Sequence, residues 1–389
     1  MPLSNAEPTT YPVVDTGQTS FFDGMKAISK PRAGSAFDGQ DASFARNPPR
    51  YADNGDGTVT DEVTGLVWQK GFAVMTYQEA LRKQKVFSLG GKTDWRLPDI
   101  KELYSLALFS GVDASGPGME RVPKGAKPFL DAVFGFEYGS NGPRTIDTQL
   151  LSSTIYQGKT MGGMKTVFGF NAADGRIKGY PVSDPRTRSG KRFTVRFVRG
   201  NPEYGKNKLH DHGDGTIHDN ATGLMWEKAD SGRGMDWKNA LAWVRGKNAE
   251  KYLGHDDWRL PNAKELHSIV DVTRGPQSTK SAAISPLFEI SQIKDEAGRD
   301  AFPSFWTSTT HQNTRGGTDA VYICFGEALG WFKPPGAPGS PRLLDVHGAG
   351  AQRSDPKTGG ASRFPRGRGP QGDVVRSKHH VRMVRDIRP

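Results

Sequence analysis

The sequence predicts an α+β protein made of two tandem copies of one domain, each with two helices on a small antiparallel sheet and long loops. One observation is a repeated phrase, TDWRLPDIKELYSL at residues 93–106 and DDWRLPNAKELHSI at residues 256–269. A second is a hairpin pattern that opens each copy. The third is composition: 48 glycines and 26 prolines in 389 residues favour turns and long loops over a helical bundle.

Five landmarks recur in the same order and indicate a duplication. Residues 56–70 (DGTVTDEVTGLVWQK) match residues 214–228 (DGTIHDNATGLMWEK) without a gap. After the repeated phrase come LLSSTIY and FWTSTTH, the strand-like runs TVFGFNAADGRI and AVYICFGEALGWF, and the endings FTVRFVRG and HVRMVRD. The repeat is far too long for a solenoid, so we expect each copy to form its own domain. The expected division is a leader (1–50), a first copy (51–200), a linker (201–207) and a second copy (208–389).

Each copy is expected to begin with a hairpin and a helix. The Asp-Gly pairs at residues 56–57 and 214–215 suit a tight turn with positive φ. In the first copy Thr76 and Glu79 have the spacing of a capping box, and in the second copy Asp236 is the expected N-cap.

The repeated phrase is then expected to form a corner between an extended segment and a second helix. A proline precedes a strong N-cap residue, and a glutamate three positions later can bond back to the cap. The tryptophan is expected to pack beside the helix, and the arginine to pair with the glutamate. These structural residues are Trp95, Arg96, Asp99 and Glu102 in the first copy and Trp258, Arg259, Asn262 and Glu265 in the second.

The last strand of each copy, VRFVR or VRMVR, alternates apolar residues with arginine. A strand of this pattern is expected to bury one face and to present a basic face on the other side. Together the elements give the α+β module described above.

The net charge of +11 is unevenly distributed. Basic clusters attract polyanions such as nucleic acids, anionic lipids and acidic or sulfated polysaccharides, although solvated loops explain them equally well. One cluster comprises Arg186, Arg188, Lys191, Arg192, Arg196 and Arg199, and the other Arg353, Lys357, Arg363, Arg366, Arg368, Arg376 and Lys378.

In these motifs the chain resembles the Lcl C-terminal domain family. The family pattern of a DGTVTD hairpin, a DWRLPxxKEL corner, an SST strand and a VRxVR ending occurs twice, with TST replacing SST in the second copy. The resemblance implies a C-type-lectin-like fold, shared with the formylglycine-generating sulfatase-modifying enzymes. It also implies an exported or surface protein that binds sulfated glycosaminoglycans. The start of the chain has no basic and apolar signal segment, which is expected of a cytoplasmic protein or of a mature form.

Catalysis is not expected. The formylglycine-generating enzymes use a pair of cysteines, whereas Cys324 is the single cysteine and is expected in the core. Neither a phosphate-binding loop nor a specific nucleic-acid motif is present, and no apolar run is long enough to span a membrane.

A structural calcium ion is an alternative role for the aspartates of the two hairpins, which we otherwise interpret as turn formers. No cofactor is expected besides such an ion. The candidate calcium ligands are Asp53, Asp56, Asp61, Asp211, Asp214 and Asp219.

The function expected from the sequence is that of a non-catalytic, adhesin-like surface or secreted binding protein. Guanidinium groups match the geometry of sulfate and carboxylate, so basic loops are expected to bind an acidic or sulfated glycan. The expected ligand-binding residues are Arg353, Lys357, Arg363, Arg366, Arg368, Arg376, Arg186 and Arg188. The alternatives are an assembly component with protein partners or a homo-oligomer, and a metal-dependent enzyme of unknown reaction.

Overall fold

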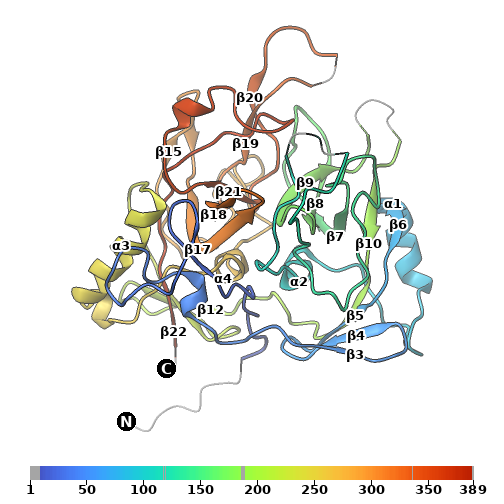
Figure 1. The fold of residues 1–389 in the computed structure, drawn as a ribbon, viewed down its shortest axis with the longest axis horizontal. Helices are drawn as coiled ribbons and strands as arrows, with labels where there is room; N and C mark the ends of the chain where they lie inside the picture. The colour runs from blue at the N-terminus through green and yellow to red at the C-terminus, as the bar shows by residue number, and fades with distance from the viewer. Residues whose placement is uncertain (1–8, 117, 119, 185–188, 335, 388–389) are drawn as a thin grey trace.

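The computed structural model of the chain describes residues 9–116, 118, 120–184, 189–334 and 336–387. Short helices and many strands give the α+β class that the sequence predicts (Figure 1). The described α-helices are α1 (Tyr77–Lys83), α2 (Ile100–Ser105), α3 (Trp237–Ala249) and α4 (Ala263–Ser268). The 3-10 turns are η1 (Asp41–Ser43), η2 (Gln84–Val86), η3 (Tyr252–Gly254) and η4 (Ala361–Arg363). None of the described helices is both long and apolar enough to cross a membrane.

Each copy contains a four-stranded antiparallel sheet that its final strand completes. In the first copy the order is β11 (Val198–Gly200), β5 (Leu66–Gln69), β4 (Thr58–Asp61) and β3 (Tyr51–Asp53). In the second it is β12 (Leu209–Asp211), β13 (Thr216–Asp219), β14 (Leu224–Glu227) and β22 (Val384–Asp386). The expected opening hairpins are therefore present in both copies.

The repeated phrase forms the predicted corner. Asp99 and Asn262 both make complete capping boxes with the glutamate three residues later. The strand that carries SST or TST locks each corner, since Thr154 Oγ1 accepts the Ile100 N–H at 3.0 Å and Thr309 Oγ1 accepts the Ala263 N–H at 3.0 Å. The corner is thus a structural unit whose parts come from distant segments.

The other predicted contacts of the phrase are also present. Arg96 pairs with Glu102, and Arg259 Nη1 lies 2.6 Å from Glu265 Oε2. Trp95 packs with Tyr77 and Ala80 of α1, and Trp258 packs with the corresponding residues of α3. Thr76 and Asp236 cap these two helices as predicted.

A further sheet, of eight strands, runs through both copies. Its order is β17 (Ser304–Asn313), β18 (Gly316–Cys324), β21 (Gln352–Pro356), β9 (Arg176–Pro181), β8 (Thr166–Asn171), β7 (Gln149–Ile155), β10 (Arg192–Val195) and β6 (Ala73–Thr76). The copies meet where β21 pairs with β9, at Gln352 and Ile177. Two copies that each fold on a separate sheet were expected, but the larger sheet is shared.

The described residues also form three two-stranded sheets. They are β1 (Phe21–Phe22) with β2 (Ala27–Ile28), β15 (Ile293–Lys294) with β16 (Asp300–Ala301), and β19 (Leu329–Phe332) with β20 (Arg342–Asp345).

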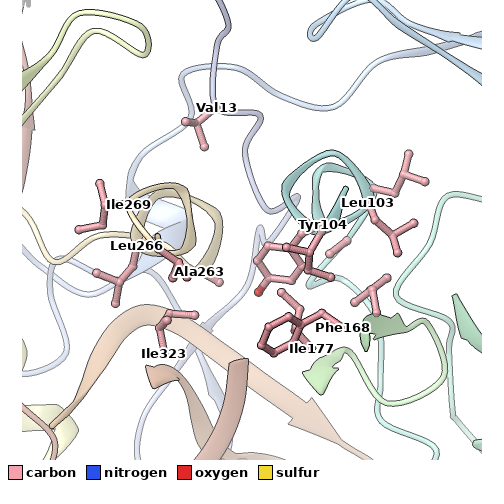
Figure 2. Close-up of a cluster of buried hydrophobic side chains, with 14 of the residues drawn as sticks. Val13, Leu103, Tyr104, Phe168, Ile177, Ala263, Leu266, Ile269 and Ile323 are labelled. Carbon is pink, nitrogen blue, oxygen red and sulfur yellow. The ribbon is translucent and has the colours of Figure 1, made fainter. Parts of the chain in front are cut away.

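The main core is also shared. Helices α2 and α4 lie side by side against the large sheet, and Figure 2 shows Tyr104 facing Ala263 and Leu266 above Ile177 and Ile323. The leader contributes Val13 to the same cluster. This core therefore depends on the leader and on both copies together.

The two corner helices are tied to each other by equivalent lysines. Lys101 Nζ donates to the carbonyl of Ser268 at the end of α4, at 2.7 Å, and Lys264 Nζ donates to the carbonyl of Ser105 at the end of α2, at 2.7 Å. Burial lowers the pKa of Lys101 to about 8 and that of Lys264 to about 7. The lysine of the repeated phrase therefore joins the copies in a reciprocal, two-fold manner.

The prediction that the last strand of each copy presents a basic face to solvent is wrong for the central arginine of each strand. Arg196 and Arg382 are 1% and 0% exposed. Arg382 donates to the carbonyls of Glu227, Lys228, Ala229 and Glu289 at 2.6–2.9 Å. Because a buried guanidinium can satisfy several carbonyls at once, this arginine fastens loops together instead of facing solvent.

Candidate functional site

A cavity of about 730 Å³ opens at the junction of the two copies. We call it the seam cavity, because β9 of the first copy and β21 of the second copy both line it. On β9, Arg176 and Lys178 line the cavity and flank Ile177, which lies in the core against α2 and α4. Since side chains alternate along a strand, the cavity lies on the face of the sheet opposite the helices.

The two copies connect equivalent strands differently, and this difference builds the cavity. In the first copy residues 172–175 join β8 to β9, whereas in the second copy residues 325–351 separate β18 from β21. By analogy with the first copy, in which β9 pairs with β8, β19 would pair with β18. In the structure β21 takes that position, and β19 pairs with β20 instead.

The long connection crosses onto the first copy. The N–H of Met161 donates to the carbonyl of Asp345 at 2.7 Å, and the N–H of Gly179 donates to the carbonyl of His347 at 2.8 Å. A Cβ at Gly179 would lie 2.6 Å from that oxygen, so this close approach requires glycine. These contacts hold the wall of the cavity in place.

Most of the cations in the cavity are already paired. In the first copy, Arg176 Nη1 lies 2.8 Å from Asp113 Oδ2, and Lys178 pairs with Asp174. In the second copy, Arg368 Nη1 lies 3.2 Å from Asp319 Oδ1. Polar groups fixed in this way can bind a ligand without a large reorganisation of the site.

Arg353 has the most buried side chain of the paired cations that line the cavity. It is 9% exposed, it pairs with Asp373, and Asp373 also accepts a hydrogen bond of 2.8 Å from Nε2 of His347. The other guanidinium nitrogen, Nη1, is buried and has no hydrogen-bond partner among the described residues. A buried donor of this kind is costly to leave unpaired, and a hollow of about 20 Å³ lined by Arg353, Asp373 and His347 is large enough for one water molecule as its acceptor.

The pKa shifts indicate how the charges are distributed. Burial would raise the pKa of Asp373, but the charge of Arg353 outweighs burial and holds the pKa below its usual range. Burial lowers the pKa of His347 to about 4, so this imidazole is neutral at pH 7. Burial raises the pKa of Asp355 well above its usual range, which favours the neutral acid there.

Three arginines lie at the rim of the cavity. The side chains of Arg144 and Arg368 are 39% and 33% exposed and are paired with aspartates. Arg315 is exposed and makes no ion pair with any described residue. The rim therefore presents positive charge to an incoming ligand.

The expected ligand-binding arginines do not form one surface. Arg353 and Arg368 line the seam cavity, Arg376 makes a two-pronged pair with Glu296, and Arg363 and Arg366 are exposed. Arg186 and Arg188 lie outside the described residues.

The interpretation of Lys357 as part of an exposed basic loop is wrong. Its Nζ is buried, donates to the carbonyl of Asp23 at 3.0 Å and to Thr310 Oγ1 at 2.8 Å, and lies over the ring of Trp237. Burial lowers its pKa well below the usual value for lysine. The local sequence gave no sign of this, because the partners come from the leader and from a distant strand.

The hairpin aspartates serve the turns. Asp56 and Asp214 accept the N–H groups of Thr58 and Thr216 at 3.0 and 2.9 Å. Asp53 and Asp211 pair with Lys70 and Lys228, and Asp61 and Asp219 accept backbone N–H groups in the following turn. Across the described ranges, no group of three or more His, Cys, Asp or Glu side chains is arranged to hold a metal ion.

Cys324 is 2% exposed and packs in the core of the second copy, as the sequence predicts. Burial raises its pKa to about 12, which disfavours the reactive thiolate.

Sequence reasoning missed most of the cavity. Asp113, Asp319, Asp373 and the β9 pair Arg176 and Lys178 come from four separate segments and meet only because β9 pairs with β21. The one local signal is the run RIKGY, in which charged residues alternate with Ile177 and Gly179.

The fold and the site define a duplicated α+β protein with a charged cavity between its two copies. The family model of the Lcl C-terminal domain matches residues 57–199 and again residues 215–334, and the chain belongs to this family. Comparison with curated proteins and with solved structures finds no match.

Proposed function

We propose that this chain is a non-catalytic binding protein of the cell surface or envelope that recognises acidic or sulfated glycans at the mouth of the seam cavity. The observation that carries the proposal is the set of cations at and beside this mouth. Arg315 there is exposed and has no ion pair among the described residues, and Arg363 and Arg366 are exposed on the segment that leads to Arg368. Guanidinium groups of this kind bind sulfate and carboxylate groups with two parallel hydrogen bonds.

The proposal moves the expected site from loops alone to a cavity with a basic rim. Small-molecule and saccharide sites are generally concave, with a few fixed polar groups that orient the ligand. The C-type-lectin-like character of the fold and the location outside the cytoplasm are part of this proposal, and they rest on the resemblance.

Heparin binding tests the proposal. We expect the double variant Arg315→Ser, Arg366→Ser to bind a heparin column about tenfold more weakly, which corresponds to about 1.4 kcal/mol. The matched control is Arg82→Ser, Lys85→Ser, which removes the same charge from exposed residues beside the edge strand β6. Elution at equal salt for both double variants would mean that binding follows net charge alone, and the proposed site would be wrong.

A further inference from the structure

We propose that one proton, held on two neighbouring carboxyl groups, controls the attachment of the long connection (residues 325–351) to the first copy. We call these groups, those of Asp345 and Glu327, the carboxyl pair. The connection carries His347 into the wall of the seam cavity, so its attachment also keeps that wall in place. This device lies beyond the proposed function, because it requires no ligand.

Asp345 fastens the connection to the first copy with both its main chain and its side chain. Its carbonyl accepts the N–H of Met161 at 2.7 Å, and its Oδ2 accepts the hydroxyl of Tyr156 at 2.7 Å. Its Oδ1 accepts the N–H of Gly348 within the connection at 2.8 Å. Asp345 is 6% exposed and Tyr156 is 3% exposed, so water has little access to this contact between the copies.

Gln277 brings Glu327 to the same place. Its Nε2 lies 2.8 Å from Glu327 Oε1 and 3.3 Å from Asp345 Oδ2. The same nitrogen lies 3.0 Å from the carbonyl oxygen of Lys159 in the first copy. Three acceptors thus surround an amide nitrogen that carries only two hydrogens. One further proton on the carboxyl pair supplies the missing hydrogen and removes the repulsion between two like charges.

No ion pair offsets the negative charge of the carboxyl pair among the described residues. Glu327 is half-buried at the start of the connection, and Asp345 is buried near its end. Lys159 and Arg274 lie on the two neighbouring loops, but neither makes an ion pair with these carboxyl groups. A buried carboxylate without a cation is costly, so the protonated form is favoured here.

The same arrangement sets the charge of Asp345. Burial, followed by the charge of Glu327, raises its pKa to about 7, against the opposing hydrogen bonds from Tyr156 and Gly348. Burial also raises the pKa of Tyr156 and lowers that of His347 to about 4, so neither group is charged at pH 7. In a detached connection, Asp345 meets water and has a pKa of about 3.9. The stabilisation of the attached state is therefore complete below about pH 4 and is lost as the pH rises through 7.

The corresponding contact in the opposite direction differs in this respect. His311 occupies the position of Tyr156 in the second copy, and its Nε2 lies 2.8 Å from the carbonyl oxygen of Asp174 in the first copy. Burial would raise the pKa of Asp174, but the charges of Lys178 and Arg176 outweigh burial and hold it below its usual range. Of the two contacts, the one at Asp345 is therefore the one that responds to a proton between pH 4 and 7.

Amide hydrogen exchange in the full chain measures the attachment, with EDTA present so that no cation replaces the proton. The reporter amides are those of Met161, Gly179 and Gly348, which donate to Asp345 or His347. After scaling for the intrinsic effect of pH on exchange, we expect their protection to fall at least tenfold between about pH 5 and about pH 8. A fall of less than twofold in the wild-type chain overturns the proposal.

Asp345→Asn keeps the size of the side chain without an ionisable group, so the reporter amides should keep the same protection, within twofold, at both pH values. The matched control is Asp41→Asn, the same substitution at a buried aspartate of the leader whose pKa is also about 7. We expect this control to retain the tenfold change. The proposal is wrong if the change persists in Asp345→Asn, or if Asp41→Asn abolishes it, since the pH dependence would then belong to the whole fold.

Glu327→Gln is a second variant in case Asp345→Asn does not fold. It removes the charge that raises the pKa of Asp345 and keeps a side chain of the same size. We expect the change in protection between the two pH values to be at least threefold smaller than in the wild type. An unchanged pH dependence in Glu327→Gln would show that the two carboxyl groups do not act as a pair.

Discussion

The two copies share most contacts of the corner, and among their differences one connection builds the cavity. Arg196 and Arg382 satisfy corresponding carbonyls, and Thr154 and Thr309 lock corresponding helices. By contrast, residues 172–175 form a short turn where the second copy has residues 325–351. The comparison shows that a duplicated framework can stay fixed while one changed connection creates a cavity that neither copy has alone.

The leader adds to the difference between the two copies, because its hydrogen bonds are mainly to the second copy. The Gln18 amide donates to the carbonyl of Thr310 at 2.8 Å and accepts its N–H at 2.9 Å. Asp41 accepts a hydrogen bond from the hydroxyl of Thr309. Among the described contacts, Thr154, the counterpart of Thr309 in the first copy, has no equivalent carboxylate partner. The leader is therefore an integral part of the fold around the second copy.

The largest expected effect comes from the buried arginines, and it compares the copies directly. Arg382 donates to four carbonyls and Arg196 to three. Replacing either with methionine leaves these buried acceptors unpaired, so we expect a loss of about 3–5 kcal/mol, larger for Arg382→Met. Urea denaturation monitored by circular dichroism measures it.

The matched control lies three residues further along the chain. Arg385 pairs with Asp257, whose side chain is 50% exposed, so Arg385→Met should cost less than about 1 kcal/mol. Equal losses for Arg382→Met and Arg385→Met would contradict the role assigned to the buried arginine.

The reciprocal lysines should give a smaller and unequal effect. Lys101 Nζ donates to three acceptors, which needs all three protons, whereas Lys264 Nζ donates to two. We expect Lys101→Met to cost about 2–3 kcal/mol and Lys264→Met about 1–2 kcal/mol, because each leaves helix-end carbonyls unpaired. Thermal unfolding at pH 7 measures both, and a greater cost for Lys264→Met would show that the count of acceptors does not decide the order.

A further expected effect depends on pH and concerns the junction of the leader and the second copy. Burial raises the pKa of Asp41 to about 7, against the opposing hydrogen bonds of Thr309 and Thr16. The folded chain therefore binds this proton more tightly than the unfolded chain, whose aspartate has a pKa of about 3.9. The resulting stabilisation is complete below about pH 4 and is lost as the pH rises through 7.

Asp41→Asn tests this pH dependence, since the amide keeps the size of the side chain without a charge. We expect the variant to gain up to about 3 kcal/mol over the wild type at pH 8, and the gain to vanish near pH 4. Denaturation at several pH values measures the difference. A constant difference across the pH range would show that Asp41 does not titrate between folded and unfolded states.

The sequence by itself determined the duplication, the opening hairpins, the helix caps and the pairing of Arg96 with Glu102 and of Arg259 with Glu265. These features depend on residues close together in the chain, where spacing and local hydrogen bonding decide the structure. They could therefore be predicted from one copy and checked against the other.

Only the tertiary structure decided how the copies join and which charges are buried. The shared sheet depends on the pairing of β9 with β21, across the residues 182–351 that separate them. The same pairing and the packing of distant segments bury Arg196, Lys357 and Arg382 and bring Arg353 beside Asp373. A basic residue looks the same in the sequence whether it faces solvent or carbonyl groups, because the free energy of its burial depends on partners that only the complete fold supplies.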